Sequence, residues 1–149
     1  MKFLCDQMLG TLAKWLRIYG FDTFYVKREM DDSEILKISK KENRVLITKD
    51  KELIYNARRE QIRVIELQEV NLDNQIKNIL ENVKFQKTSV LTRCLICNGL
   101  LSKIDKKDVK NKAPPKVFEN HKDFLFCNTC KKVYWKGTHY KKMLEKIGL

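Results

Sequence analysis

The sequence predicts an α/β protein in which helices cover both faces of a mostly parallel sheet, followed by a small metal-stabilised domain. Two observations support this fold class. Over residues 1–83, short apolar segments alternate with segments whose apolar residues recur at helical spacing, which is typical of strand–helix–strand units. After residue 93 the alternation gives way to short apolar pieces and two Cys-x-x-Cys pairs. We therefore expect a first domain at 1–83, a linker at 84–93 and a second domain at 94–149.

The first strand–helix unit is expected at residues 2–19. Lys2–Cys5 is a short, mainly apolar strand, and Asp6 follows at its carboxyl end. A helix should then run to about residue 19, because its apolar residues recur every three or four positions: Met8, Leu9, Leu12, Leu16 and Tyr19. The remaining side carries a polar stripe, and a glycine is expected to end the helix: Thr11, Lys14 and Arg17, then Gly20.

Three more units of the same kind follow. The expected strands are 23–26, 44–48 and 63–67, and the expected helices are 31–43, 51–59 and 71–82. Asp31 and Glu34 form a capping-box pattern at the start of the second helix. In open α/β sheets, ligands bind outside the carboxyl ends of the strands. Acidic residues that follow strands are therefore the first candidates for a functional site.

Three such acids are Asp6, Asp32 (or its neighbour Asp31) and Asp50. Each of them alone fits a helix N-cap, where Asp is a favoured residue. Together they should face one cleft, because the carboxyl ends of neighbouring parallel strands lie at the same edge. Carboxylates without cationic partners repel one another, and a divalent cation relieves this. Two Mg²⁺ or Mn²⁺ ions would suit phosphodiester hydrolysis, with Thr48 and Lys14 assisting.

The second domain contains two cysteine pairs, Cys94/Cys97 and Cys127/Cys130. Four thiolates can complete a tetrahedral Zn²⁺ site, and such a site is structural because the protein fills every position. Disulfides are the alternative, but they are rare in the cytoplasm. Cys5 stands alone in the first strand and is expected to be a buried apolar residue. His139 is expected on the surface or in packing, not as a ligand.

Charge is concentrated in the second half of the chain. Residues 1–83 hold 15 Lys+Arg and 14 Asp+Glu, whereas residues 84–149 hold 16 and 5. Clustered positive charge indicates a nucleic-acid partner, although a solubilising lysine coat would look the same. Three lysines near aromatic residues suit RNA, since lysines contact phosphates and aromatic rings stack on bases: Lys131, Lys132 and Lys136, beside Tyr134 and Trp135. These aromatic residues also suit a small core.

The chain has no apolar run long enough to span a bilayer, and its charged first residues do not form a signal peptide. We therefore expect no membrane association and a cytoplasmic location. There is also no GxxxxGK[ST] or GxGxxG motif, so nucleotide-binding loops are not indicated.

Several segments, taken together, resemble the Mut-seven C-terminal RNase family: FLCDQMLGTLAKWLRIYGFDT, DDSEIL, VLITKDKEL, RCLICNGLL, PPKVF and FCNTCKKVYWKGTHYKKM. The resemblance spans nearly the whole chain. It implies a PIN-like three-layer α/β/α nuclease domain followed by a zinc ribbon with a C-terminal helix. It also implies metal-dependent RNA cleavage by Asp6, Asp32 and Asp50. PIN nucleases commonly use four acids, and the fourth is open here: Asp31, Glu34 or Glu52.

Two functions follow as hypotheses. The first is a ribonuclease in which Mg²⁺ or Mn²⁺ binds the acids, Lys14 and Arg17 contact substrate phosphates, and the basic zinc ribbon binds RNA. The second is a non-catalytic RNA-binding or ribosome-associated module on an inactive PIN-like scaffold, in which the acids serve only as helix caps.

Overall fold

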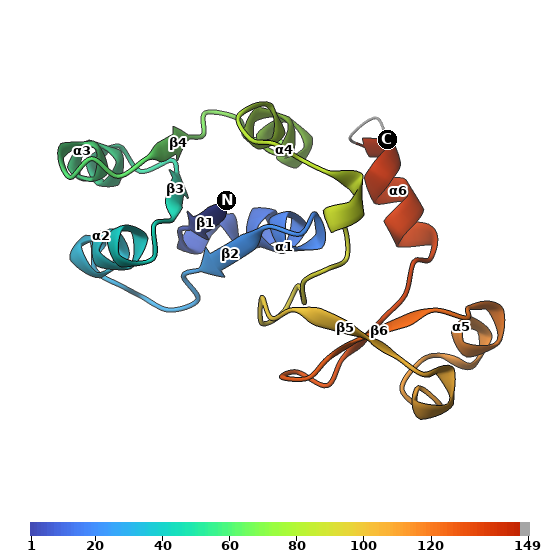
Figure 1. Cartoon of the computed structure of the whole chain (residues 1–149). Coiled ribbons are helices and arrows are strands. Elements are labelled where there is room, and N and C mark those ends of the chain that lie inside the picture. The colour runs from blue at the N-terminus through green and yellow to red at the C-terminus, as the bar shows by residue number, and fades with distance from the viewer. Residues whose placement is uncertain (147–149) are drawn as a thin grey trace.

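In the computed structural model, which describes residues 1–146, four parallel strands form the centre of the first domain. They are β1 (Lys2–Cys5), β2 (Asp22–Tyr25), β3 (Val45–Thr48) and β4 (Val64–Glu66), in the spatial order β2-β1-β3-β4. Phe3 of β1 lies opposite Thr23 of β2 and Val45 of β3. The predicted parallel sheet is therefore confirmed (Figure 1).

Helices cover both faces of this sheet. A 3-10 turn, η1 (Gln7–Leu9), leads into α1 (Gly10–Ile18), and α2 (Asp32–Lys41), α3 (Lys51–Arg59) and α4 (Leu72–Glu81) follow the later strands. Each helix lies within about two residues of its predicted bounds, except that the predicted first helix is divided into η1 and α1. The α/β fold class of the sequence analysis is confirmed.

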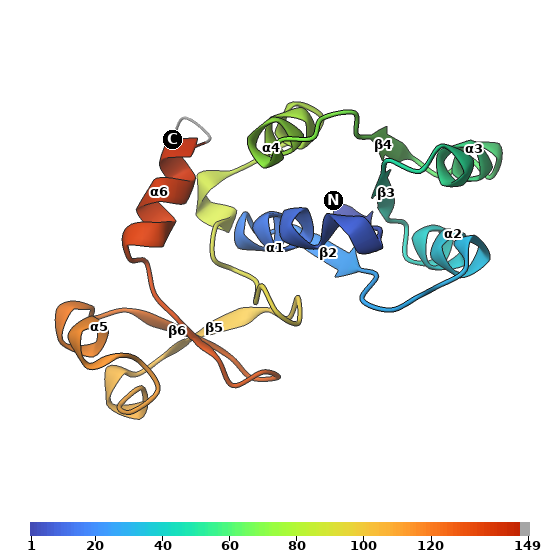
Figure 2. The same ribbon diagram turned by 180° about the vertical axis from the view of Figure 1, so that it is seen from behind.

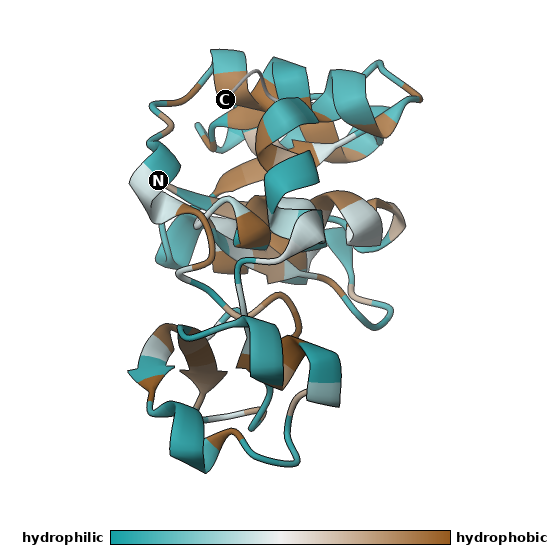
Figure 3. Ribbon diagram, turned by 90° about the vertical axis from the view of Figure 1, so that its right-hand side faces the viewer, coloured by the Kyte–Doolittle hydropathy of each residue, from teal (hydrophilic) through white to brown (hydrophobic). Residues whose placement is uncertain are grey.

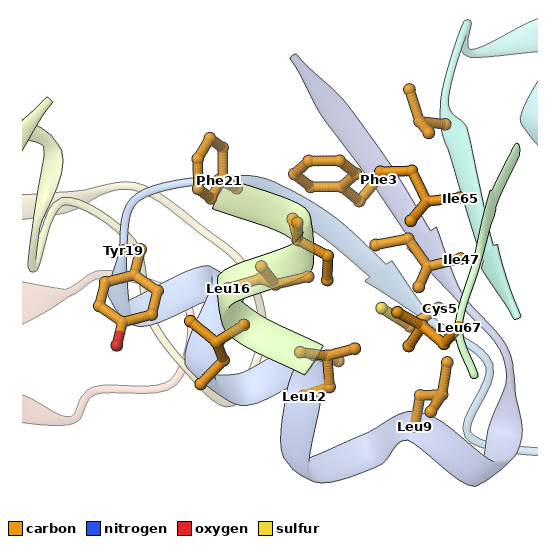
Figure 4. Close-up of a cluster of buried hydrophobic side chains, with 14 of the residues drawn as sticks. Phe3, Cys5, Leu9, Leu12, Leu16, Tyr19, Phe21, Ile47, Ile65 and Leu67 are labelled. Carbon is orange, nitrogen blue, oxygen red and sulfur yellow. The ribbon is translucent and has the colours of Figure 1, made fainter. Parts of the chain in front are cut away.

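Alternate residues of the central strands face two separate cores, as the two-residue period of a strand requires. Phe3 and Cys5 lie in a core with residues of α1 and α4, shown in Figure 4. Leu4 and Leu46 lie in the other core, with residues of α2 and α3. The central strands are thus buried on both sides, which explains their nearly continuous apolar sequence.

The second part of the chain is a small antiparallel sheet in the order β5-β6-β7, of which Figure 2 labels β5 and β6. Its strands are β5 (Leu101–Ile104), β6 (Phe124–Cys127) and β7 (Val133–Tyr134), and the turn η3 (Lys106–Asp108) and helix α5 (Pro115–Asn120) lie between β5 and β6. Helix α6 (Thr138–Lys146) follows; its predicted end at residue 147 and the last two residues lie outside the described part. Figure 3 shows how hydrophilic residues dominate the short helices of this part.

None of the helices within residues 1–146 has the length and apolar character needed to cross a membrane.

We call the small sheet with its two cysteine pairs the ribbon. The segment before it and helix α6 after it both pack against the first domain. The segment 84–93, which contains the turn η2 (Lys87–Ser89), places Val90 and Leu91 in the core of α1 and α4, and α6 adds Leu144 to the same core. The Leu91 amide donates to the Ile18 carbonyl at 2.8 Å. Gly20 makes this approach possible: its φ is 96°, and a Cβ there would lie 2.2 Å from the Ser89 carbonyl oxygen.

A polar contact at the edge strand β2 completes the junction. Asp22 accepts hydrogen bonds from Arg44 at 2.8 Å and from the Asn98 side chain at 2.7 Å. Arg93 lies 3.7 Å from the same carboxylate. Burial opposes the ionisation of Asp22, but the hydrogen bonds from Arg44 and Asn98, together with the positive charges of Arg44 and Arg93, outweigh it and lower the pKa of this carboxyl below its usual value.

Arg17 takes part in this junction, and its predicted place on a polar stripe is wrong. The residue is only 5% exposed. Its guanidinium donates to the carbonyls of Thr23, Leu95 and Ile96 at 2.9–3.0 Å. Residues Leu95 and Ile96 of the ribbon cover the end of α1 at Arg17. A polar side chain at this position therefore faces backbone carbonyls instead of water.

Candidate active site and metal centre

The strand order creates a crevice at the carboxyl edge of the sheet. The chain leaves β1 toward α1 on one face and leaves β3 toward α3 on the other. Such a switch point between adjacent strands is where open α/β sheets bind their ligands. Asp6 follows β1 directly, and Asp50 lies two residues after the end of β3. The two acids therefore flank the crevice.

The three acids predicted for the site line one cleft of about 380 Å³ at this position. Asp6 comes from the turn after β1, Asp32 from the first residue of α2, and Asp50 from the residue before α3. The cleft also contains Gln7 and Lys49, which the sequence analysis did not single out. Lys49 could have been predicted from the sequence, because it stands between a buried strand and Asp50.

Hydrogen bonds orient Asp6. One carboxylate oxygen accepts the Met8 amide at 3.1 Å, and the other accepts the Thr48 hydroxyl. The Thr48 hydroxyl also accepts the Asp50 amide at 3.1 Å. Thr48 is fully buried, so it links the loops after β1 and β3 and fixes the carboxylate between them.

Asp50 caps α3 by accepting the Leu53 amide at 3.1 Å. An ionised carboxylate has about four acceptor positions, so neither Asp6 nor Asp50 is saturated by these bonds. Both remain able to bind a cation while they hold their loops.

Asp32 carries the clearest sign of accumulated negative charge. Among the described residues, its carboxylate forms no side-chain hydrogen bond and no ion pair. Burial raises its pKa, and the charges of Asp50, Glu52, Asp31 and Asp6 raise it further, in that order. Mutually repelling carboxylates in a cleft are the donor set that hard divalent cations such as Mg²⁺ and Mn²⁺ prefer.

The three candidates for a fourth acid differ in their surroundings. The negative charges of Glu52 and Asp31 both raise the pKa of Asp32. Glu34 does not appear among these charges and instead pairs with Arg28 at 3.9 Å. Within residues 1–146, the acids do not form a group of three whose oxygens all lie as close together as the cysteine sulfurs described next.

The two cysteine pairs form the tightest cluster of metal-binding side chains in the described chain. The Sγ atoms of Cys94, Cys97, Cys127 and Cys130 all lie within 4.8 Å of one another. No disulfide joins them. Four sulfur donors at this separation fit one tetrahedral Zn²⁺ ion, as predicted from the sequence.

Each pair is held in a tight knuckle. After the first pair, Asn98 has a φ of 68°, and after the second, Lys131 has a φ of 61°. Backbone amides point at sulfur in both, from Gly99 to Cys97 and from Cys130 to Cys127, each at 3.4 Å. The left-handed turn expected at Asn98-Gly99 is therefore present. Among the described residues, His139 is not part of the cluster.

The predicted substrate-binding cations occupy different environments. Lys14 is exposed on α1, and Lys131, Lys132 and Lys136 are exposed on the ribbon. Lys131 lies over the Phe126 ring and Lys136 over the Tyr140 ring, at 5.8 and 5.4 Å from the centroids. Arg17 differs from these exposed lysines, because it is buried and its guanidinium donates to backbone carbonyls.

Comparison with known proteins gives one family. The model of a family described as Mut7-C RNAse domain matches residues 1–147. A search of curated proteins found no match.

Proposed function

The chain belongs to the Mut7-C RNAse domain family, and from this premise we propose that it is a metal-dependent ribonuclease that hydrolyses phosphodiester bonds of RNA. The observation that carries the proposal is the cleft at the switch point of the sheet, where Asp6, Asp32 and Asp50 lie together and the pKa of Asp32 is raised. Uncompensated carboxylates at a ligand-binding edge are typical of a catalytic cation site.

In this proposal Asp6, Asp32 and Asp50 hold Mg²⁺ or Mn²⁺, and Glu52 or Asp31 supplies the fourth acid. When bound, a divalent cation neutralises charge on the phosphate and makes an attacking water more acidic. The buried Thr48 hydroxyl keeps Asp6 aimed into the cleft. Lys49 at the cleft and Lys14 on α1 hold substrate phosphates, each as a compact positive charge.

The ribbon has a separate task. Zinc held by Cys94, Cys97, Cys127 and Cys130 would stabilise it, since a domain of this size has a small core and natural domains of this size often add a structural metal. Its lysines, with Lys131, Lys132 and Lys136 among them, bind the RNA backbone. This division of work matches the division of charge between the two halves of the chain.

A second candidate function has its own observation. Asp6 and Asp50 each accept a backbone amide at the start of the following turn or helix, which is what a helix cap does without any catalysis. A non-catalytic RNA-binding or ribosome-associated module on an inactive scaffold would keep these bonds and use only the ribbon.

The Asp6→Asn variant separates the two functions. Asparagine keeps the size of the side chain but removes the charge that binds the cation. We expect cleavage of a labelled single-stranded RNA in Mg²⁺ or Mn²⁺ to fall at least about a hundredfold, with RNA affinity unchanged or increased. Asp73→Asn, on the exposed surface of α4, is the matched control and should cut like the wild type. Wild-type protein that binds RNA in either metal but never shortens it would establish the second function instead.

A further inference from the structure

A second pocket lies where the ribbon, α6 and α1 meet. Its volume is about 320 Å³, at the lower end of the range for small-ligand sites. Three half-buried aromatic residues, one histidine and one lysine line it together with a residue of the first domain: Tyr134, Trp135, Tyr140, His139, Lys132 and Ile18. The ring surfaces suit a flat, aromatic group.

The aromatic walls are held in place by contacts behind them. The Trp135 ring packs edge-on against Phe124, with centroids 6.5 Å apart. Gly137 leaves room for this indole, because a Cβ there would lie 3.0 Å from the Trp135 ring nitrogen. The Tyr134 hydroxyl contacts the Cys94 sulfur at 3.1 Å. The pocket is therefore formed before any ligand binds.

Positive charge surrounds the pocket. Lys132 lines it, and Lys136 lies over the Tyr140 ring. A neighbouring groove shares Trp135 with the pocket and carries four lysines against two aspartates: Lys103, Lys106, Lys122 and Lys136, with Asp105 and Asp123. An aromatic recess bordered by lysines suits a ligand that combines a ring with phosphates, and nucleic acid is the polymer with that chemistry.

Helix α1 connects this pocket with the acidic cleft. Leu9, just before the helix, lines the cleft, and Ile18 at its end lines the pocket. Nine residues of helix separate them, which is about 14 Å at the rise of an α-helix. Between them, Thr11 and Lys14 are exposed and share one helix face with Ile18, at spacings of three and four. A strand that follows this face would meet the Lys14 cation between the pocket and the cleft.

We propose that the pocket holds one unpaired nucleobase of an RNA whose backbone follows α1 to the acidic cleft. The inference rests on the proposed ribonuclease function and adds the form of the substrate, a single strand anchored a few nucleotides from the bond that is cut. A base in a duplex must first lose its pairing and stacking to enter a recess between aromatic rings, whereas a base in a single strand is already free to do so.

Binding measurements on the full-length, zinc-loaded protein without added Mg²⁺ or Mn²⁺ test the inference. The probes are a fluorescent oligouridylate and an abasic oligomer of equal length, which keeps the phosphates and lacks the bases. We expect His139→Ala and Tyr140→Leu to weaken binding of the oligouridylate by about tenfold and to leave binding of the abasic oligomer unchanged. His121→Ala, at the other histidine and outside the pocket, is the matched control and should bind both probes like the wild type.

The two variants protect the test against a folding defect. Tyr140 also packs against the first domain, whereas His139 is exposed, so we expect His139→Ala to leave the fold intact. Equal weakening of both probes, or no weakening of either, would overturn the base pocket. Cleavage of RNA by pocket variants with unchanged affinity would overturn the pocket and leave the nuclease standing. If the variants lose affinity for the oligouridylate alone, and the metal-loaded wild type does not cleave RNA, the base pocket stands and the nuclease function is overturned.

Discussion

At the residue scale, Glu52 and Glu34 have equivalent chemistry but different surroundings. Glu52 contributes to the raised pKa of Asp32, whereas Glu34 pairs with Arg28 at 3.9 Å. If Glu52 is the fourth acid, Glu52→Gln should reduce RNA cleavage about 10- to 100-fold and weaken Mn²⁺ binding. Glu34→Gln is the control and should retain wild-type rates. Cleavage kinetics of both variants over a range of Mn²⁺ concentrations will show which glutamate is the fourth acid. Loss of activity in Glu34→Gln alone would reverse the assignment.

The five cysteines should fall into two classes by reactivity. Cys5 is fully buried, and burial, followed by the charge of Asp6, raises the pKa of its thiol. The other four are expected as zinc ligands. In native protein, chelation should therefore release zinc and expose four thiols to a disulfide reagent at pH 8, and the fifth should react only after denaturation. A fifth thiol that reacts in the folded, zinc-loaded protein would contradict this.

At the element scale, Asp22 of β2 joins the ribbon to the first domain. We expect Asp22→Asn to lower the free energy of unfolding at pH 7 by about 1–3 kcal/mol, because Arg44 and Asn98 lose a charged partner. Asp73→Asn removes the exposed pair with Lys146 and a negative charge in the first turn of α4, and should cost no more than about 1 kcal/mol.

The sign of the pH dependence follows from the lowered pKa of Asp22. A carboxyl with a lower pKa in the folded state stabilises the fold above its unfolded pKa, and this contribution is lost as the pH falls through the folded value. The difference between Asp22→Asn and wild type should thus stay constant from pH 7 to about pH 5 and shrink below about pH 4. Urea unfolding at several pH values measures it. A difference that fades between pH 7 and pH 5 would show that another group dominates.

Elements and site differ in how far the sequence could predict them. The parallel sheet followed from the alternation of strand and helix patterns, and the cleft from acids placed at strand ends. Arg17 could not be placed in this way, because its position on the helix is the same whether water or a second domain covers it. The packing of 84–93 against the first domain could not be predicted either, since Val90 and Leu91 are only two adjacent apolar residues and show no helical or strand periodicity.

At the scale of the whole molecule, the first domain does not have a complete core within residues 1–83. Val90, Leu91 and Leu144 are 4–7% exposed in the core of α1 and α4, and burial of such a side chain contributes about 1.5–3 kcal/mol. A fragment of residues 1–83 should therefore unfold at a clearly lower urea concentration than the whole chain. A fragment of residues 1–93, which keeps two of the three, should lie between them. An equal midpoint for 1–83 and the whole chain would show that the first domain is autonomous.

The anchoring of both ends of the ribbon has a consequence for variation in this chain. The 29 residues between the two cysteine pairs begin and end at the cysteine cluster. The Arg17 and Asn98 side chains fasten this cluster to the first domain. A loop closed in this way tolerates insertion, since doubling its length costs only about 0.6 kcal/mol in closure entropy. The mostly exposed stretch 110–114, which lies outside the strands and helices, can therefore change in length while β5, β6 and the anchoring Asn98 stay as they are. If the ribbon binds RNA as proposed, insertion of residues into 110–114 is a route to redirecting the protein toward different RNA molecules.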